Sequence, residues 1–396
     1  MPSPVLAHVV GCVDAAEDQL LALRRDLHAH PELAWGEERT TRTVAEHLDA
    51  YGLEIRLLPK SGLIAEVGPA EGPVVALRAD LDALPVEDRT RAAWRSTVDG
   101  VAHACGHDVH TSALVGAGLA LADAHRRHPL PWRVRLLFQP AEEIMPGGAL
   151  EVLAAGALDR VDRVFGLHCD PTIDVGHVGL RVGPLTGAAD SISVRLTGRG
   201  GHTSRPHLTE DLTYALAKLV TELPGALSRR LDPRAGASLV WGMVRAGSAK
   251  NVIPAAGEAA GTLRMLDAVA WVDAEDVVRE LIGQLVAPYG VGAEVTYVRG
   301  VPPVVNEAVA TEVLERAVLA VLGEDGPVST QQSLGGEDFA WYLESLPGAM
   351  GRLGTRTPGG PTYDLHQGDL DIDERAVAVG AKVLAAVAVS APVTGA

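Results

Sequence analysis

Side chains that could bind a metal ion recur in short segments along this chain. Cys105 and His107 lie two residues apart in HACGHD, and thiolate and imidazole are strong ligands for borderline-soft metals such as zinc. The segment QPAEE adds the adjacent carboxylates Glu142 and Glu143. With two further histidines, the set of metal-type donors is Cys105, His107, Glu143, His168 and His366. This combination predicts a metal centre, which none of the segments would do by itself.

One carboxylate of the adjacent pair, Glu142, is left without a ligand role. When two acids stand side by side, one can bind a metal while the other stays free to move a proton. A second interpretation makes Cys105 a nucleophile, with His107 or His103 as its base. That interpretation leaves the surplus of imidazole and carboxylate donors unexplained, so we favour the metal centre.

The segments that carry these donors follow apolar runs that are typical of buried parallel strands. Three such runs are VVALRADLDALP (74–85), VRLLFQPAEE (134–143) and VFGLHCD (164–170), and residues 111–128 have the helical period. Alternating strands and helices predict an α/β sheet with helices on both faces. Sites in such sheets form beyond the carboxyl ends of the strands, where we expect four of the five donors.

The middle of the chain has a different pattern, in which strands alternate between polar and apolar residues. The expected order is strand 191–200, helix 211–227, strands 238–245 and 259–266, helix 274–287 and strand 293–300. This β-α-β-β-α-β order is that of a ferredoxin-like α+β domain. We therefore expect such a domain at 186–296, inserted into a catalytic domain formed by 1–185 and 297–396.

Composition excludes several classes of function. The chain has 396 residues and a net charge of −17, which argues against a nucleic-acid-binding surface. Three cysteines cannot form a disulfide framework, and no signal peptide is evident, so we expect a cytoplasmic protein. The apolar stretch 376–393 contains Lys382, Ser390 and Pro392, which favours a packed helix over a membrane span.

In their order along the chain, the motifs resemble those of the M20 metallopeptidase family, in its branch of hippurate, N-acyl-amino-acid and auxin-conjugate hydrolases. The matching segments cover nearly the whole chain: LRRDLHAHPEL (23–33), RADLDALPV (78–86), HACGHDVHT (103–111), FQPAEE (138–143), GLH (166–168), GRGGHTSRPH (198–207), NVIP (251–254), GGEDF (335–339) and LH (365–366). The resemblance implies a catalytic α/β domain with a mixed, largely parallel sheet. It also implies that the inserted domain is a lid that forms a homodimer.

The resemblance also implies roles for the donor residues. Cys105 would be shared by two divalent ions, Zn²⁺ or Mn²⁺, with Ni²⁺ or Co²⁺ as alternatives, and the other ligands would be His107, Glu143, His168 and His366. Glu142 would be the general base, and Asp82 would orient a ligand histidine. One departure from the family pattern is Leu370, which stands where a phenylalanine is usual and would alter the packing behind His366.

Three residues of the expected insertion could complete the site. The resemblance makes His202 a donor to the oxyanion, reaching the active site from the dimer partner, although spacing alone makes it a turn histidine beside two glycines. Asn251 and Arg264 could hold the free carboxylate of a substrate.

The expected function is that of an amidohydrolase that cleaves N-acyl amino acids with a metal-activated water and a glutamate base. One alternative is a metal-dependent aminoacylase or dipeptidase that acts on small peptides. The other is a noncatalytic metal-binding or ligand-binding protein of the same fold. A free carboxylate at Glu142 argues against that last alternative, because proton transfer needs it and binding does not. We expect a small-molecule substrate, no nucleic acid and no membrane.

Overall fold

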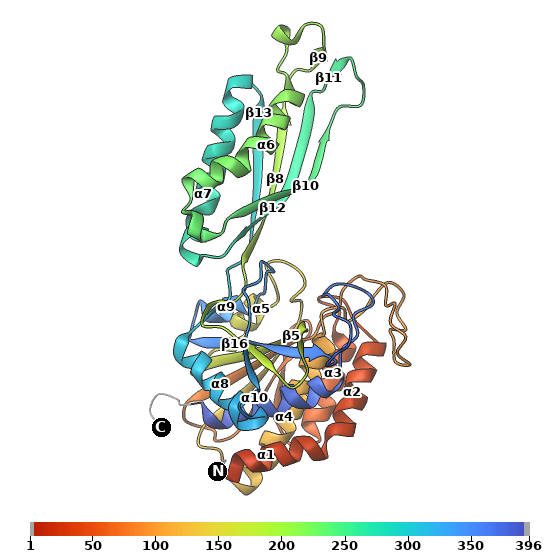
Figure 1. The fold of residues 1–396 in the computed structure, drawn as a ribbon, viewed down its shortest axis with the longest axis vertical. Helices are drawn as coiled ribbons and strands as arrows, with labels where there is room; N and C mark the ends of the chain where they lie inside the picture. Colours follow the sequence, from red (N-terminus) through yellow and green to blue (C-terminus); the bar gives the residue numbers. More distant parts are fainter. Residues whose placement is uncertain (1–3, 392–396) are drawn as a thin grey trace. The chain divides into compact units, whose positions relative to one another are not determined.

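A computed structural model describes residues 4–391 of the chain. It separates into two compact units, which are described in turn (Figure 1). Unit 1 comprises residues up to Leu185 together with Val305–Gln331 and the segment from Asp338 onward, and unit 2 comprises Thr186–Val304 and Gln332–Glu337.

Unit 1 is built on an eight-stranded sheet in the order β1-β2-β4-β3-β5-β16-β6-β15. The strands are β1 (Glu54–Leu57), β2 (Leu63–Val67), β3 (Val74–Asp80), β4 (Arg133–Gln139), β5 (Val161–Asp174), β6 (Val178–Leu180), β15 (Pro327–Ser329) and β16 (Gly348–Arg356). The central strands β4, β3, β5 and β16 are parallel, whereas β1 and β2 pair antiparallel at one edge. A separate two-stranded ladder pairs β7 (Gly183–Pro184) with β14 (Val305–Asn306). The sheet is mixed and largely parallel, as the sequence predicted.

The central strands are largely apolar because both faces of the sheet are covered, although β3 also buries Arg78 and Asp80. Every residue of β3 is buried, from Val74 to Asp80. The helices of unit 1 are α1 (Pro4–Ala15), α2 (Glu17–Ala29), α3 (Glu38–Asp49), α4 (His107–Arg127), α5 (Ala149–Ala154), α8 (Ala308–Leu322), α9 (Ala340–Leu343) and α10 (Arg375–Ser390). Figure 1 shows α4 and α10 below the sheet and α5 and α9 above it.

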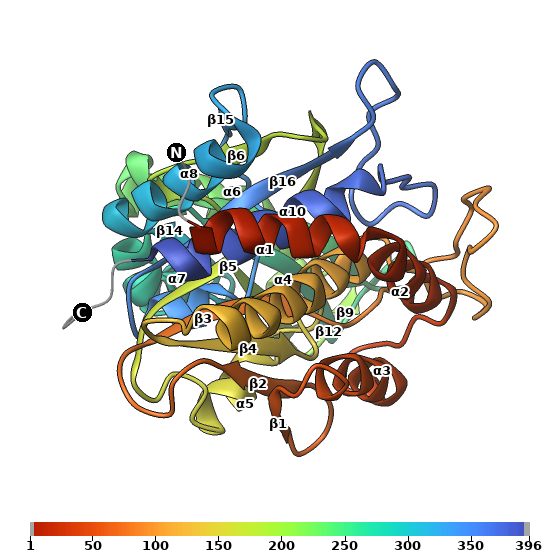
Figure 2. The same ribbon diagram turned by 90° about the horizontal axis from the view of Figure 1, so that it is seen from below.

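Helices α4 and α10 form the centre of the lower layer, where they pack on each other and on α1 (Figure 2). Nearly all of α4 is buried, including its first residue, His107. Helix α10 accounts for most of the apolar stretch noted in the sequence, and its Ala and Val side chains lie in the core. Pro392 of that stretch lies outside the described residues. Within residues 4–391, no helix combines the length and apolar character needed to cross a membrane.

Unit 2 has a four-stranded antiparallel sheet in the order β10-β12-β8-β13. Its main elements are β8 (Ala188–Thr197), α6 (Leu212–Arg230), β10 (Ser238–Ala246), β12 (Ala256–Met265), α7 (Ala268–Val286) and β13 (Gly292–Val301). Along β8, Ile192, Val194 and Leu196 are buried while the residues between them are exposed, because helices cover one face of the sheet. The short strands β9 (Gly201–His202) and β11 (Val252–Ile253) pair at one end of this unit (Figure 1).

Candidate metal centre

The predicted donors come from several different elements of unit 1, and two of these elements are strands of its sheet. Glu142 and Glu143 follow β4, and Cys105 and His107 lie at the start of α4. His168 lies inside β5 rather than after it, because that strand continues to Asp174.

The structure brings all five predicted ligands together. Cys105 Sγ lies 3.5 Å from His168 Nε2, and Glu143 Oε1 lies 3.7 Å from His107 Nε2 and 3.5 Å from His366 Nε2. Their donor atoms form two groups, Cys105–His107–His168 and Cys105–Glu143–His366, each within 4.8 Å. Cys105 belongs to both groups, so its sulfur stands where one thiolate could serve two ions.

Two of the three predicted ligand histidines, His107 and His168, are oriented by backbone carbonyls. His107 Nδ1 lies 2.8 Å from the carbonyl oxygen of Asp82, and His168 Nδ1 lies 2.8 Å from that of Cys169. A carbonyl can only accept, so each Nδ1 must donate, and Nε2 is the ring atom left to bind a metal, once the proton on His107 Nε2 has been displaced. Among the residues that the structure describes, His107 Nε2 and Glu143 Oε1 are buried without a hydrogen-bond partner. A bound cation would satisfy both atoms, and the mixture of S, N and O donors fits a divalent transition metal.

The electrostatics of the cluster also favour a cation. Burial disfavours the charged form of His107, but Asp80, Asp82 and Glu143 outweigh it and raise the pKa of His107 to about 10. Burial keeps the pKa of His168 well below its ordinary value, with Arg352 adding to the effect, so this imidazole is neutral. Burial also raises the pKa of Cys105, and Glu143 and Glu142 add to the rise. The negative potential that holds a proton on His107 would attract a metal ion, whose charge would in turn deprotonate the thiol.

Asp82 holds the two glutamates by their backbone. Its carboxylate oxygens accept hydrogen bonds from the amides of Glu142 at 3.0 Å and Glu143 at 2.9 Å, and its side chain is buried. The bond to His107 comes from the Asp82 carbonyl, while the carboxylate stays 3.5 Å from the ring. Asp82 therefore positions the loop that carries both glutamates as well as a ligand histidine.

Asp80 is a site residue that sequence reasoning missed. Its carboxylate accepts from His110 Nδ1 at 2.6 Å and from Arg78 at 2.6 Å, and it lies 3.7 Å from His107 Nε2. Burial raises the pKa of Asp80, but His107, His110 and Arg78 outweigh it and hold the pKa well below its usual value. The sequence offered one indication of this role. Asp80 stands two residues before Asp82, and in an extended chain this spacing places both carboxylates on the same face.

The three residues predicted in the insertion belong to unit 2, whereas the donors belong to unit 1. His202 pairs with Val252, and its Nδ1 accepts from the amide of Ser204 at 3.1 Å. Asn251 lies beside this ribbon, where its carbonyl accepts from Thr203 at 3.3 Å.

Arg264 lies far from Asn251 within unit 2. It follows Ala256, the first residue of β12, by eight positions, which is roughly 26 Å along an extended strand. Its guanidinium donates to the carbonyl of Leu334 at 2.6 Å. Asn251 and Arg264 of one chain therefore cannot hold the same carboxylate.

Two other features of the surface contain charged or metal-type side chains. In unit 1, His8 lies 2.7 Å from Asp123 with Cys12 beside them, but Arg126 and Arg127 engage the same carboxylate at 3.0 and 3.3 Å. That group is an ion-pair cluster.

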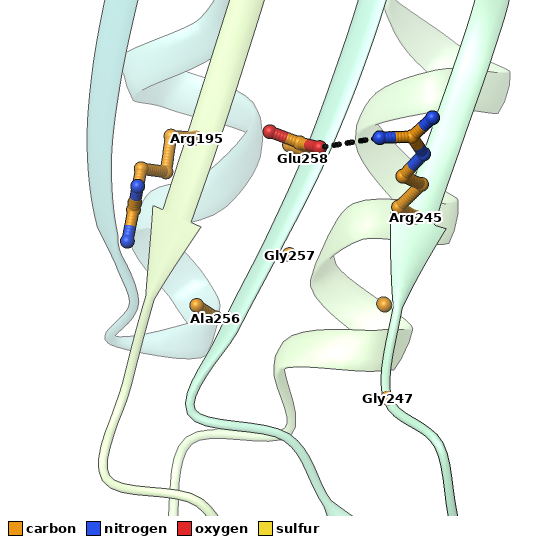
Figure 3. A pocket seen from close by; sticks show the side chains of 7 residues that line it. Arg195, Arg245, Gly247, Ala256, Gly257 and Glu258 are labelled. Carbon is orange, nitrogen blue, oxygen red and sulfur yellow. Dashed lines mark ion pairs between the residues drawn. The ribbon is translucent and has the colours of Figure 1, made fainter.

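In unit 2, a hollow of about 300 Å³ lies on the open face of the sheet. Arg195 and Arg245 flank Glu258 there, and Arg245 pairs with that glutamate at 3.7 Å (Figure 3). Neither this hollow nor the ion-pair cluster contains any of the predicted site residues.

Comparisons with known proteins agree with the cluster in unit 1. Residues 76–390 match the model of Peptidase family M20/M25/M40. The chain is 37% identical to an N-acetylcysteine deacetylase of Bacillus subtilis, over 95% of this chain and 97% of that protein. A crystal structure of a dinuclear metal binding peptidase of the M20 family, also from Bacillus subtilis, superposes with a TM-score of 0.82 at 35% identity, covering 95% of this chain and 98% of that one.

A longer relative from Rhodococcus jostii is provisionally named a glutamate–cysteine ligase. The chain is 51% identical to it over 371 residues, which is 93% of this chain. The match spans 46% of that relative, so the chain corresponds to about half of it.

Proposed function

The chain belongs to peptidase family M20/M25/M40 and is a metal-dependent hydrolase of amide bonds, and we propose that its substrates are N-acyl amino acids. The observation that carries this proposal is the position of Glu142. Its carboxylate is buried 4.0 Å from His107 Nε2, directly beside the two donor groups that share Cys105. Relatives named as deacetylases and as an N-acyl-L-amino acid amidohydrolase support this substrate class.

We propose that the cluster holds two divalent ions, with Zn²⁺ or Mn²⁺ the first candidates and Ni²⁺ or Co²⁺ the alternatives. Cys105, His107 and His168 would hold one ion, and Cys105, Glu143 and His366 would hold the other. When bound, such ions polarise an amide carbonyl and make a nearby water more acidic.

Glu142 and Asp82 would then have different roles in hydrolysis. Glu142 would accept a proton from the attacking water and pass it to the leaving amine nitrogen as the amide bond breaks. Asp82 would keep Glu142 and Glu143 in place through their backbone amides. Burial of Glu142 itself limits the number of orientations that its side chain can take.

We propose that unit 2 is the element through which the chain dimerises. Because Asn251 and Arg264 lie at opposite ends of β12, a site that uses both would take them from two copies of the chain. We propose a homodimer through unit 2, in which His202 of the second copy donates to the oxyanion and Asn251 and Arg264 contribute to binding the substrate carboxylate. We also propose a cytoplasmic setting, since Cys105 must stay reduced to bind a metal.

The test of this function is a substrate screen on metal-depleted and metal-reloaded protein. We expect chelation to abolish hydrolysis of N-acetyl and N-benzoyl amino acids, N-acetylcysteine among them, and Zn²⁺ or Mn²⁺ to restore it. Glu142→Gln should keep its metal by elemental analysis and lose about 10²- to 10⁴-fold in kcat. The partly exposed Glu151, which pairs with Lys60, offers a matched control, and Glu151→Gln should be fully active.

Three outcomes would contradict parts of the proposal. A metal-loaded Glu142→Gln protein with full activity would refute the role of the base. Activity that survives chelation but not thiol alkylation would support a Cys105 nucleophile. Hydrolysis confined to dipeptides with a free amine would favour the peptidase alternative. A relative named a carboxypeptidase is the reason to test for this activity.

A further inference from the structure

The loop that carries Glu142 begins with a strained residue. Ala141 directly precedes Glu142 and has φ 55°, in the left-handed region that residues with a side chain rarely adopt. Such a conformation persists when surrounding contacts over-determine it. Asp82 holds the amides of the two residues that follow, so the contact that fixes Ala141 itself must come from elsewhere.

That contact comes from Glu37, whose side chain is fully buried. Glu37 Oε1 accepts a hydrogen bond from the Ala141 amide at 2.8 Å, and Oε2 accepts from the Ser61 hydroxyl at 2.7 Å. Two buried carboxylates, Glu37 and Asp82, thus hold three consecutive amides, at residues 141, 142 and 143.

Glu37 is itself fixed from several sides. It directly precedes α3, and its carbonyl accepts from the Thr41 hydroxyl at 2.6 Å. The same Thr41 oxygen accepts from the amide of Gly62 at 2.7 Å. Gly62 has φ 83°, and a Cβ there would lie 2.6 Å from the carbonyl of Phe138 and 2.7 Å from the Pro140 ring. The start of α3 and the 61–62 turn are therefore packed directly against the end of β4.

A carboxylate is a costly choice for a site that needs two hydrogen-bond acceptors. Burial raises the pKa of Glu37, since the charged form loses its contact with water. An ordinary α3 cap does not explain this choice, because Glu32 already accepts the amides of Arg39 at 3.0 Å and Thr40 at 2.8 Å. Glu37 differs from Glu32 in reaching the loop of Glu142.

We infer that Glu37 is a positioning residue for amide hydrolysis, because it holds Ala141 in its left-handed conformation and so sets the direction of the Glu142 side chain. Without that bond, Ala141 can return to an ordinary φ while Asp82 still anchors the amides of Glu142 and Glu143. The base then rotates relative to the metal donors. The inference rests on the proposed function of Glu142 as the base.

The experiment compares three variants of Glu37 with a matched control in the metal-loaded protein. Glu37→Ala and Glu37→Asp, which is too short to reach both Ala141 and Ser61, should lower kcat about 10- to 100-fold with KM little changed. Glu37→Gln keeps an oxygen that can accept from the Ala141 amide, and its NH₂ group can donate to the Ser61 hydroxyl. Its kcat should therefore stay within about threefold of the parent value. Glu32→Gln should lower thermal stability and leave kcat unchanged.

A second readout does not depend on metal or activity. In the metal-free protein, hydrogen exchange of a peptide that covers 138–145 should be faster in Glu37→Ala and Glu37→Asp, and unchanged in Glu37→Gln and Glu32→Gln. If Glu37→Ala does not fold, Glu37→Asp provides the same comparison. The inference is overturned if Glu37→Asp keeps the parent kcat and exchange, or if Glu32→Gln loses as much kcat. Full activity of Glu142→Gln would instead overturn the proposed function, whatever the Glu37 variants do.

Discussion

The substitution Asp82→Asn measures how firmly the glutamate loop is held. Each carboxylate oxygen of Asp82 accepts one backbone amide, at 3.0 Å from Glu142 and 2.9 Å from Glu143, and the residue is 1% exposed. Asparagine has one oxygen, so its NH₂ group would face the second amide. A buried donor left without an acceptor costs about 1–3 kcal/mol, and the remaining bond loses its charge assistance, worth about 1 kcal/mol more. We expect the free energy of unfolding to fall by about 2–4 kcal/mol.

The assay is urea unfolding of the metal-free protein, because bound metal would add its own stabilisation. A lower midpoint at unchanged slope would report a loss of stability rather than a change in the unfolded state. In the reloaded protein, the displaced loop should also weaken metal retention, which competition with a chelator measures.

Glu307→Gln is the matched control for this experiment. The two oxygens of Glu307 accept the amides of Val309 at 3.0 Å and Ala310 at 2.7 Å, but Glu307 is partly exposed. Water can replace a lost bond there, so the cost should stay below about 1 kcal/mol. An Asp82→Asn protein as stable as its parent, or a Glu307→Gln protein destabilised equally, would refute the reasoning.

Three further predictions concern other parts of the chain. Burial lowers the pKa of His28, but Asp108, 2.8 Å away, outweighs it and raises the pKa to about 9. A raised histidine pKa stabilises the fold fully below about pH 6.5 and loses its effect as the pH rises through about 9. The contribution of His28 to the free energy of unfolding in urea should fall by up to about 3 kcal/mol across that interval, and His28→Gln should remove this part of the pH dependence while leaving the part due to His107. Gly106→Ala places a Cβ 2.8 Å from Cys169 Sγ at φ 86°, so the protein should lose about 2 kcal/mol of stability and bind metal more weakly in titrations. Asp190→Ala removes a buried acceptor of an indole N–H at 2.8 Å and an amide at 2.9 Å in unit 2, so hydrogen exchange there should quicken while the metal content stays the same.

The sequence predicts well those parts of the fold that leave a local pattern. Long apolar runs indicate β3, β4 and β5, because both faces of these strands are buried. Alternation of apolar and polar residues indicates β8, because only one of its faces is buried. The short strands β6 and β15 have three residues each, too few for a periodicity to emerge.

For the candidate site, residue types pointed to the proposed donors and the family resemblance to the supporting residue Asp82, but neither pointed to Asp80 or Glu37. Cys105 and His107 could be named because few residue types bind metals and they stand close together. Glu37 could not be named, since its partner Ala141 lies 104 residues away and the bond joins a side chain to a backbone amide. Any residue can supply such an amide, so no pattern in the sequence records it.

The order in which the chain is synthesised has a consequence for assembly of unit 1. Its strand β16 (Gly348–Arg356) pairs with β5 (Val161–Asp174), while unit 2 is formed entirely by residues between them. All of unit 2 is therefore synthesised before the sheet of unit 1 can close, so unit 2 can fold first. His366 emerges later still, and the full donor set exists only after that residue has been made. Capture of the second metal ion should accordingly wait for this segment, and a truncated chain that ends before His366 would lack one of the donors proposed for that ion.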